Sequence, residues 1–168
     1  MVITKEKIEK LRNIDVDTIL EFYQEFYYSI LKYTIFLTND RHISEVIVHD
    51  FFIKLPLKVR KFEQGNFKIW LFVCVKNFVY DYLKLNSNNN ISFDENIHFK
   101  ATNPNNFQIF ELIEVLSPIE YEIIILHFFV GFTFKEIRIF LHLSEYQLKK
   151  YLKRSYKTIK NYYKSIYL

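Results

Sequence analysis

Three short stretches in the second half of the chain carry the same helix-start chemistry. In each, a Ser or Thr stands three residues before a Glu or Gln, so that each side chain can bond the backbone amide of the other residue. The pairs are Ser117 with Glu120, Thr133 with Glu136, and Ser144 with Gln147. Because such boxes satisfy amides that a helix start otherwise leaves without a partner, they predict helices near 118–130, 134–141 and 145–164, the first ended by Gly131.

The middle helix of this predicted series is barely two turns long. Only the residues LHLS separate it from the last helix. A connection this short does not let two antiparallel helices pack side by side, and it is typical of a helix-turn-helix. The second half of the chain is therefore predicted to contain this motif.

Apolar residues at helical spacing predict three further helices in the first half of the chain. The first helix carries a stripe made of Ile19, Phe22, Phe26, Ile30, Tyr33 and Leu37. The second helix begins after Asn39 or Asp40 and is expected to end at Pro56. Its stripe is predicted to consist of Ile43, Val46, Ile47, Phe51 and Leu55. The third helix covers residues 67–84.

Composition favours an all-α fold with two small helical domains. Half of the 168 residues are apolar, but the chain has only two Gly and three Pro, so turn-rich sheet folds are disfavoured. The stretch 86–106 is rich in Asn and poor in aliphatic residues, whereas both flanks are densely apolar. We therefore expect domains at 1–85 and 112–168, joined by a flexible linker at 86–111.

The same residues disfavour several classes of protein. Lys and Glu interrupt the first ten residues, unlike a signal peptide, so a cytoplasmic location is expected. Charged residues also break the long apolar runs, which argues against a membrane span. The five His and the lone Cys74 show no metal-ligand spacing, and no Gly-rich phosphate loop or serine elbow exists. We expect no cofactor and no enzymatic activity, and we interpret Cys74 as a small core residue.

The last predicted helix is basic on its outer side. Residues 145–168 contain six Lys and one Arg against one Glu. Its core-facing side is predicted to consist of Leu148, Tyr151, Leu152, Ser155 and Ile159. The second helix of a helix-turn-helix lies in the major groove, with its first residues at base edges and its later ones at phosphates. The candidate base readers are Glu145, Tyr146, Gln147, Lys149 and Lys150, and the candidate phosphate contacts are Lys153, Arg154 and Lys157. An ordinary solvated lysine face is the alternative.

Both halves of the chain resemble one protein family. Residues 116–159 resemble the fourth conserved region of bacterial sigma factors. The matching residues are Leu116, Gly131, Thr133, Glu136, Ile137, Leu141, Ser144, Lys149, Leu152 and Arg154. The first half resembles the second conserved region. At the motif positions of that region stand Ser44, Glu45, Val46, His49, Asp50, Phe52, Trp70, Leu71, Asn77, Asp81 and Lys84. Two such regions with only a polar linker between them resemble the small extracytoplasmic-function (ECF) group of the sigma-70 family.

The resemblance implies a polymerase-binding face in the first domain. The residues concerned are Glu45, His49 and Asp50. In the family, these positions meet the clamp helices of the largest subunit of RNA polymerase, which is a basic partner. A solvated acidic face is the alternative interpretation.

A second face of the first domain is implied to contact promoter DNA. Asn77, Asp81 and Lys84 fall within a narrow arc of the helix at 67–84. In the family, this part lies along the downstream promoter element, where the strands separate. We add Tyr80 as a candidate platform on which a base could stack. The alternative is that Asp81 pairs with Lys84 and that Asn77 bridges within the domain.

Four residues depart from the pattern of the family. Arg138 stands where alanine is usual, so its head is expected to turn to solvent or to a phosphate. His142 stands where glycine is usual, at a turn position that often requires positive φ, which costs about 1 kcal/mol for other residues. Val46 replaces an acid and Lys84 replaces arginine. A sigma-like protein that binds polymerase without reading promoters is therefore one alternative.

The sequence as a whole predicts a dissociable sigma factor that directs promoter recognition and transcription initiation. Its expected partners are core RNA polymerase and promoter DNA, and the family adds an anti-sigma protein as a candidate partner. A stand-alone helix-turn-helix regulator would explain the basic last helix equally well. It gives no reason for the helix that carries Trp70, Asn77 and Asp81, or for the acidic face. A structural helical adaptor is a further alternative.

Overall fold

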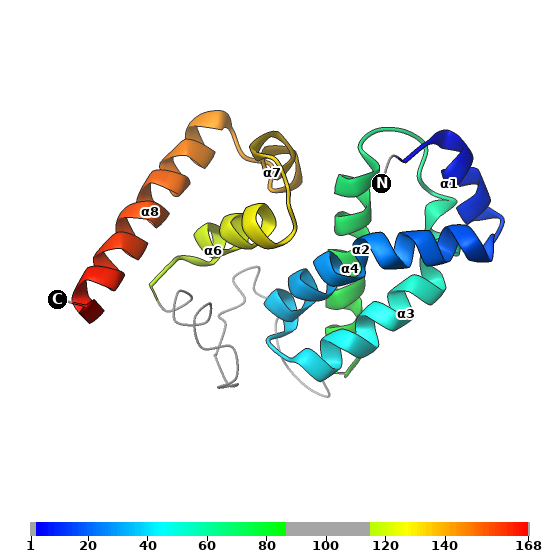
Figure 1. The fold of residues 1–168 in the computed structure, drawn as a ribbon, viewed down its shortest axis with the longest axis horizontal. Helices are drawn as coiled ribbons and strands as arrows, with labels where there is room; N and C mark the ends of the chain where they lie inside the picture. The colour runs from blue at the N-terminus through cyan, green and yellow to red at the C-terminus, as the bar shows by residue number, and fades with distance from the viewer. Residues whose placement is uncertain (1–2, 87–114, 168) are drawn as a thin grey trace. The chain divides into compact units, whose positions relative to one another are not determined.

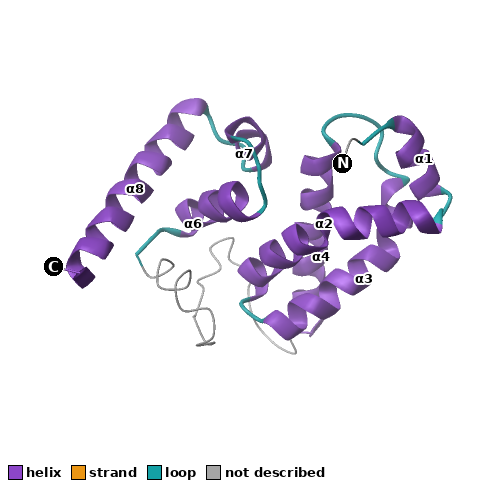
Figure 2. Cartoon of the chain, viewed as in Figure 1, coloured by secondary structure: helices purple, strands orange, loops and turns teal. Residues whose placement is uncertain are grey.

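The computed structural model describes residues 3–86 and 115–167 of the protein. Within these ranges the chain is all-helical, as predicted, and no strand occurs (Figures 1 and 2). The chain divides into two compact units, Met1–Asn88 and Asn89–Leu168. The predicted linker at 86–111 lies outside the described residues except for Asn86, which is the last residue of a helix.

The first unit is built from α1 (Lys5–Arg12), α2 (Val16–Thr38), α3 (Arg41–Val59) and α4 (Phe67–Asn86). A tight turn joins α2 to α3, and in it Asn39 has a φ of 53°. Asp40 caps α3 by accepting from the amide of Ile43 at 2.9 Å. The predicted apolar stripe of α2 is confirmed, because all its members are buried except half-buried Ile19.

Two predictions for α3 are wrong. Pro56 does not end the helix, which continues to Val59. A proline inside a helix removes one backbone bond and costs about 3 kcal/mol, but here Pro56 and Val59 are buried and the Nε of Arg12 donates to the carbonyl of Val59 at 3.3 Å. Tertiary packing therefore carries α3 past the proline. Ile43 and Val46 are not part of the core, since they are 38% and 51% exposed.

Helix α1 was not predicted from the sequence. Thr4 caps it by accepting from the amide of Lys7 at 3.2 Å, and Leu11 is fully buried. The helix is otherwise polar, with ion pairs such as Lys10–Glu6 at 2.9 Å. A single buried Leu does not make a periodic pattern, so apolar spacing offers little basis for expecting this helix.

The second unit is built from α6 (Pro118–Ile124), the π-helix η1 (Ile125–Phe129), α7 (Phe134–Phe140) and α8 (Glu145–Tyr167). All three predicted capping boxes are present. The amides of Ser117, Thr133 and Ser144 donate to the side chains three residues on at 2.9, 2.8 and 2.8 Å. These bonds start α6, α7 and α8 where the sequence predicted helix starts.

The end of the first helix in this unit differs from the prediction. The α-helix gives way to a π-helical turn, in which the amide of Val130 donates to the carbonyl of Ile125 at 3.1 Å. Gly131 then ends the segment with a φ of 74°, as predicted. The predicted positive φ of His142 is confirmed at 54°. Across both units, no described helix combines the length and the apolar character that crossing a membrane would need.

Candidate polymerase and nucleic-acid interfaces

The predicted polymerase-binding residues lie on the outer side of α3. Glu45 forms an ion pair with Arg41, in which the Nε of Arg41 lies 2.9 Å from the carboxylate of Glu45. His49 is exposed, and its ring stacks against Tyr23 with centroids 6.0 Å apart. Asp50 is half-buried. The structure thus brings Glu45, His49 and Asp50 to the surface of one helix, together with an aromatic neighbour on α2.

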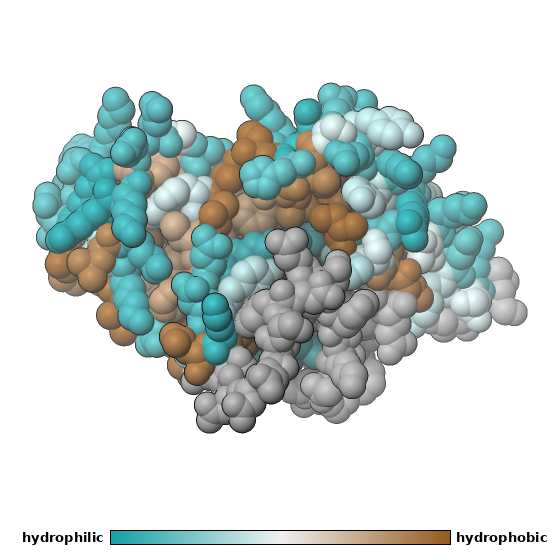
Figure 3. Space-filling model, turned by 180° about the vertical axis from the view of Figure 1, so that it is seen from behind, coloured by the Kyte–Doolittle hydropathy of each residue, from teal (hydrophilic) through white to brown (hydrophobic). Residues whose placement is uncertain are grey.

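Apolar residues on the same side of α3 extend this surface. Val46, Ile53 and Leu57 are 51%, 75% and 57% exposed. Their three-, four- and seven-residue spacing around Asp50 places all four side chains on one face. Exposed hydrophobic side chains are visible at several places on the molecule in Figure 3. Sequence reasoning missed this apolar surface because it assigned Val46 to the core.

The predicted DNA face of α4 is exposed. Asn77, Asp81 and Lys84 all reach solvent, and Tyr80 beside them is half-buried. The opposite side of α4 packs into the core through residues such as Val79, which is fully buried. The structure therefore brings the three polar residues onto one exposed face. Val73 on the same helix is also 39% exposed, and sequence reasoning did not name it as a surface residue.

The predicted reading face of α8 is also exposed. The side chains concerned all reach solvent, namely Glu145, Tyr146, Gln147, Lys149, Lys150, Lys153, Arg154 and Lys157. The predicted core side is confirmed, since Leu148 and Ser155 are buried and the other three residues are half-buried. Within the described part of the chain, no carboxylate lies at ion-pair distance from Lys150, Lys153 or Lys157. These three ammonium groups are available to an anionic partner.

The start of α8 is tied to its surroundings. Glu145 lies 2.6 Å from the Nζ of Lys149 and 3.5 Å from the guanidinium of Arg138. Hydrogen bonding and charge from Lys149, with the charge of Arg138, lower the pKa of Glu145. The head of Arg138 thus contacts Glu145, and its Nε is buried without a hydrogen-bond partner in the described residues. Gln147 uses its side-chain oxygen in the helix cap, which leaves its amide group for an outside acceptor.

Arg154 joins α8 to a buried carboxylate on α6. Glu120 is only 1% exposed, and its Oε2 accepts from the amide and the hydroxyl of Ser117 at 2.9 and 2.6 Å. The Nε of Arg154 lies 3.2 Å from the other oxygen of Glu120, an ion-pair contact without hydrogen-bond alignment. Arg154 therefore has a structural task, besides the phosphate contact that the sequence predicted for it.

We expect Arg154→Gln to lower the free energy of unfolding of the second unit by about 1–2 kcal/mol, because a buried carboxylate loses its countercharge but keeps its bonds to Ser117. Urea unfolding followed by circular dichroism measures the change. Fluorescence of Trp70, the single Trp, reports the first unit and should not change. Lys153→Gln is the matched control, with an effect below about 0.5 kcal/mol. Equal effects of the two substitutions would contradict the structural task of Arg154.

Cys74 was predicted to be a core residue, but in the structure it is only half-buried on α4. Burial raises the pKa of its thiol, whereas the charges of Lys58 and Lys61 act in the opposite direction. Substitution of both lysines by Gln should therefore raise this pKa further. We expect slower alkylation of Cys74 by iodoacetamide at pH 8, with Lys32→Gln as the control. An unchanged rate would mean that the two lysines do not act on the thiol.

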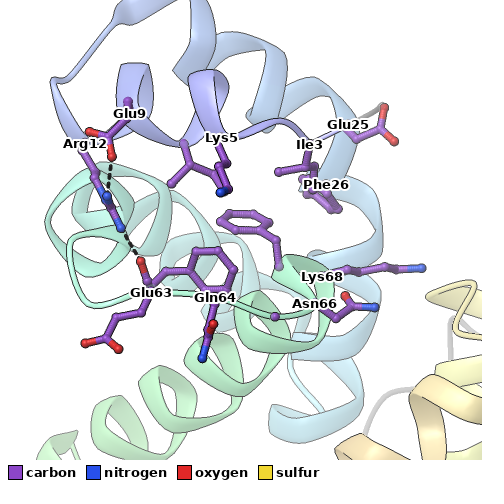
Figure 4. Close-up of a pocket in the computed structure, with 14 residues that line it drawn as sticks. Ile3, Lys5, Glu9, Arg12, Glu25, Phe26, Glu63, Gln64, Asn66 and Lys68 are labelled. Atoms are coloured by element: carbon purple, nitrogen blue, oxygen red, sulfur yellow. Dashed lines mark hydrogen bonds and ion pairs between the residues drawn. The ribbon is translucent and has the colours of Figure 1, made fainter.

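A pocket of about 820 Å³ lies in the first unit among α1, α2 and the residues that lead into α4 (Figure 4). Buried Phe26, Phe62 and Phe67 are among its lining residues. The charged lining residues are Lys5, Arg12 and Lys68 against Glu9, Glu25 and Glu63. Because these charges balance, the pocket does not select a ligand of one sign. In the described residues, no group of three His, Cys, Asp or Glu could hold a metal ion.

Comparison with known proteins adds one distant relative. The chain is 24% identical over 156 residues to the ECF RNA polymerase sigma factor SigM of Bacillus subtilis (strain 168). The match covers 87% of this chain and 95% of that protein. It therefore includes parts of both units. No family model matches the chain.

Proposed function

We propose that this chain acts as a sigma factor of the ECF type. The observation that carries the proposal is the similarity to SigM, which extends over most of both chains. It supports a sigma-factor role in broad terms, and the all-helical structure agrees with that role. A sigma factor is not an enzyme, so the role requires no catalytic residue of the chain itself.

In this proposal, the outer face of α3 docks on core RNA polymerase. Asp50 lies among the exposed apolar residues Val46, Ile53 and Leu57. An apolar centre with a charged group near it is suited to a specific protein interface, because burial supplies affinity and the charge selects a basic partner. Glu45 and His49 would lie at the edge of the same contact.

The proposal assigns promoter DNA to two other surfaces. The α4 face, with Asn77, Tyr80, Asp81 and Lys84, would contact the downstream element where the strands separate. Helix α8 would enter the major groove of the upstream element as the second helix of a helix-turn-helix. Its first residues, Glu145 to Lys150, would meet base edges, and the later cations would meet phosphates. An anti-sigma protein is a further partner that this role allows.

Transcription by purified core RNA polymerase tests the proposed function and does not require that a promoter be known. The template is sheared genomic DNA from the organism that encodes the chain, and the 5′ ends of the transcripts are sequenced with and without the protein. We expect a new set of start sites that share sequence motifs upstream. Start sites identical in both reactions would overturn the proposal.

The same experiment separates the alternative of a stand-alone helix-turn-helix regulator. Such a regulator would bind duplex DNA through α8, where three lysines carry no ion pair in the described residues. It would change the use of existing start sites but would not let core polymerase alone select new ones. Duplex binding without new start sites would therefore favour the regulator.

A further inference from the structure

Arg138 connects α7 to the first residue of α8. Its backbone belongs to the turn between the two helices, because its carbonyl accepts from the amide of Leu143 at 2.9 Å. Its side chain reaches α8, where Nη1 lies 3.5 Å from Oε2 of Glu145. The Nε atom is buried, so the surrounding residues restrict the guanidinium group. Arg138 is therefore held at the start of α8 by its backbone and by packing as well as by charge.

Glu145 is held from two sides. Its Oε2 faces Arg138, and its Oε1 lies 2.6 Å from the Nζ of Lys149, one turn along α8. Hydrogen bonding from Lys149 and the charges of both cations lower the pKa of Glu145, so its carboxyl group is ionised at neutral pH. A carboxylate has about four acceptor positions and an ammonium group has three donors. The two ion pairs therefore leave acceptor positions on Glu145 and donors on Lys149 for an outside partner.

The remaining positions match the edge of one kind of base pair. In the major groove, cytosine presents an amino donor, and the guanine paired with it presents two acceptors. An ionised carboxylate only accepts and an ammonium group only donates, so Glu145 fits the cytosine and Lys149 fits its guanine. Thymine or guanine in place of the cytosine would present acceptors to the carboxylate and repel it. Adenine has an acceptor beside its amino group, which also makes it a poorer partner than cytosine.

Arg138 supplies two things that such a contact requires. A carboxylate near DNA is repelled by the phosphates, and two cations against one carboxylate leave the whole network positive. A side chain that moves freely also loses entropy when a base fixes it. Because Arg138 approaches from another helix, it restrains Glu145 before DNA binds.

We propose that Glu145 and Lys149 together read one C·G base pair in duplex DNA, and that Arg138 is a positioning residue that fixes Glu145 for this contact. The inference rests on the proposed function only in that α8 enters the major groove, which a stand-alone regulator would share. A purely stabilising role of the network is the alternative. Exposed ion pairs contribute little to stability, and an acid in the first turn of a helix is favourable without a partner on another helix. A stabilising role would not change base preference, so base preference is the property to measure.

Selection from a random duplex library identifies the sites that the full chain prefers, and it is run with and without core RNA polymerase. We expect one C·G pair whose enrichment is lost in Glu145→Gln. Fluorescence anisotropy then compares a selected duplex with one in which T·A replaces this pair. The unchanged chain should bind the C·G duplex at least about fivefold more tightly, as expected for one correctly read base pair. Glu145→Gln with the same base preferences as the unchanged chain at every position would overturn the proposal.

Arg138→Ala tests the positioning role. Alanine is the best helix former, so α7 should stay folded, which circular dichroism checks. The preference for C·G should fall below about twofold, whereas Arg138→Lys should keep most of it because the positive charge remains. Lys7→Ala is the matched control, since Lys7 on α1 also pairs with a carboxylate on another helix, Glu21 on α2. The control should keep the full preference, and equal preferences in Arg138→Ala and Lys7→Ala would contradict the positioning role.

A double-mutant cycle separates positioning from a direct phosphate contact of Arg138. In the Glu145→Gln chain, Arg138→Ala should leave the ratio of the two affinities unchanged, because the group that it positions is already absent. If Arg138→Ala alone weakens binding of both duplexes equally, Arg138 contacts a phosphate and the positioning role is wrong.

The same measurements keep this inference apart from the proposed function. A C·G preference that depends on Arg138 in a chain that fails to bind core polymerase would leave the inference standing and reject only the sigma-factor role. New start sites without such a preference would reject only this inference.

Discussion

Glutamine in place of Lys149, Lys150 and Lys153 should remove most of the duplex-DNA affinity of the full chain. All three side chains are exposed on α8, and two of them have no ion pair in the described residues. Each phosphate of duplex DNA that the protein no longer neutralises lowers the slope of log affinity against log salt by about 0.9. We therefore expect the slope to fall by about 2 to 3, and the affinity to fall by at least tenfold at 100 mM salt.

The variant with Gln at Lys5, Lys10 and Lys32 is the matched control for this prediction. It removes three exposed positive charges from the first unit and should leave duplex binding nearly unchanged. The substitutions on α8 should not unfold the second unit, because its buried side is formed by other residues such as Leu148. Equal affinity and slope in the two variants would mean that α8 carries an ordinary solvated lysine face.

Ile53→Asp should weaken binding to core RNA polymerase by about 10- to 100-fold. Ile53 is 75% exposed at the centre of the apolar residues of α3, so the proposed interface would cover most of its side chain. Covering an Ile side chain contributes about 1.5–3 kcal/mol, and a carboxylate at the same place adds a desolvation cost. The stability of the free chain should hardly change, because the side chain is already in water.

Leu85→Asp is the matched control for Ile53→Asp. Leu85 is 82% exposed at the end of α4 and does not lie on α3. Biolayer interferometry with immobilised core polymerase compares the two variants with the unchanged chain. Equal binding of both variants and the unchanged chain would show that polymerase does not cover the apolar surface of α3.

The helix starts of the second unit could be predicted because their chemistry is local. A capping box needs only a hydroxyl and a carboxylate or amide three residues apart, and the amide of Thr133 indeed donates to Glu136 at 2.8 Å. The positive φ at His142 was instead expected from the resemblance, because the family usually has glycine at this turn position, and the structure gives a φ of 54°. Local chemistry did not reveal the π-helical turn at Ile125–Phe129, which regular spacing does not distinguish from an α-helix.

The fate of Pro56 shows where local rules fail. The rule that a proline ends a helix describes an isolated segment. In the structure, the buried side chain of Val59 and the bond from Arg12 to its carbonyl hold the last turn of α3 in place. Both contacts involve residues far apart in the chain, so periodicity within α3 could not predict them.

Of the candidate surfaces, too, one could be predicted from local spacing, whereas others depend on contacts between helices. The polar arc of α4 follows from spacing alone, and its residues are exposed as expected. Helix α3 instead has apolar residues on two sides, so its sequence did not determine whether Val46 or Ile47 faces the core. The pair Arg154–Glu120 and the contact of Lys58 with Phe78 join different helices, and only the fold brings these residues together.

The affinity of the full chain for core bacterial RNA polymerase is the most direct test of the sigma-factor proposal. It can be measured without a promoter, and it compares the unchanged chain with Asp50→Arg and with the control Glu63→Arg, an exposed reversal outside α3. We predict submicromolar binding that falls at least tenfold, or about 1.4 kcal/mol, only in Asp50→Arg. No binding of the unchanged chain at micromolar concentrations, or equal binding by all three chains, would contradict the account.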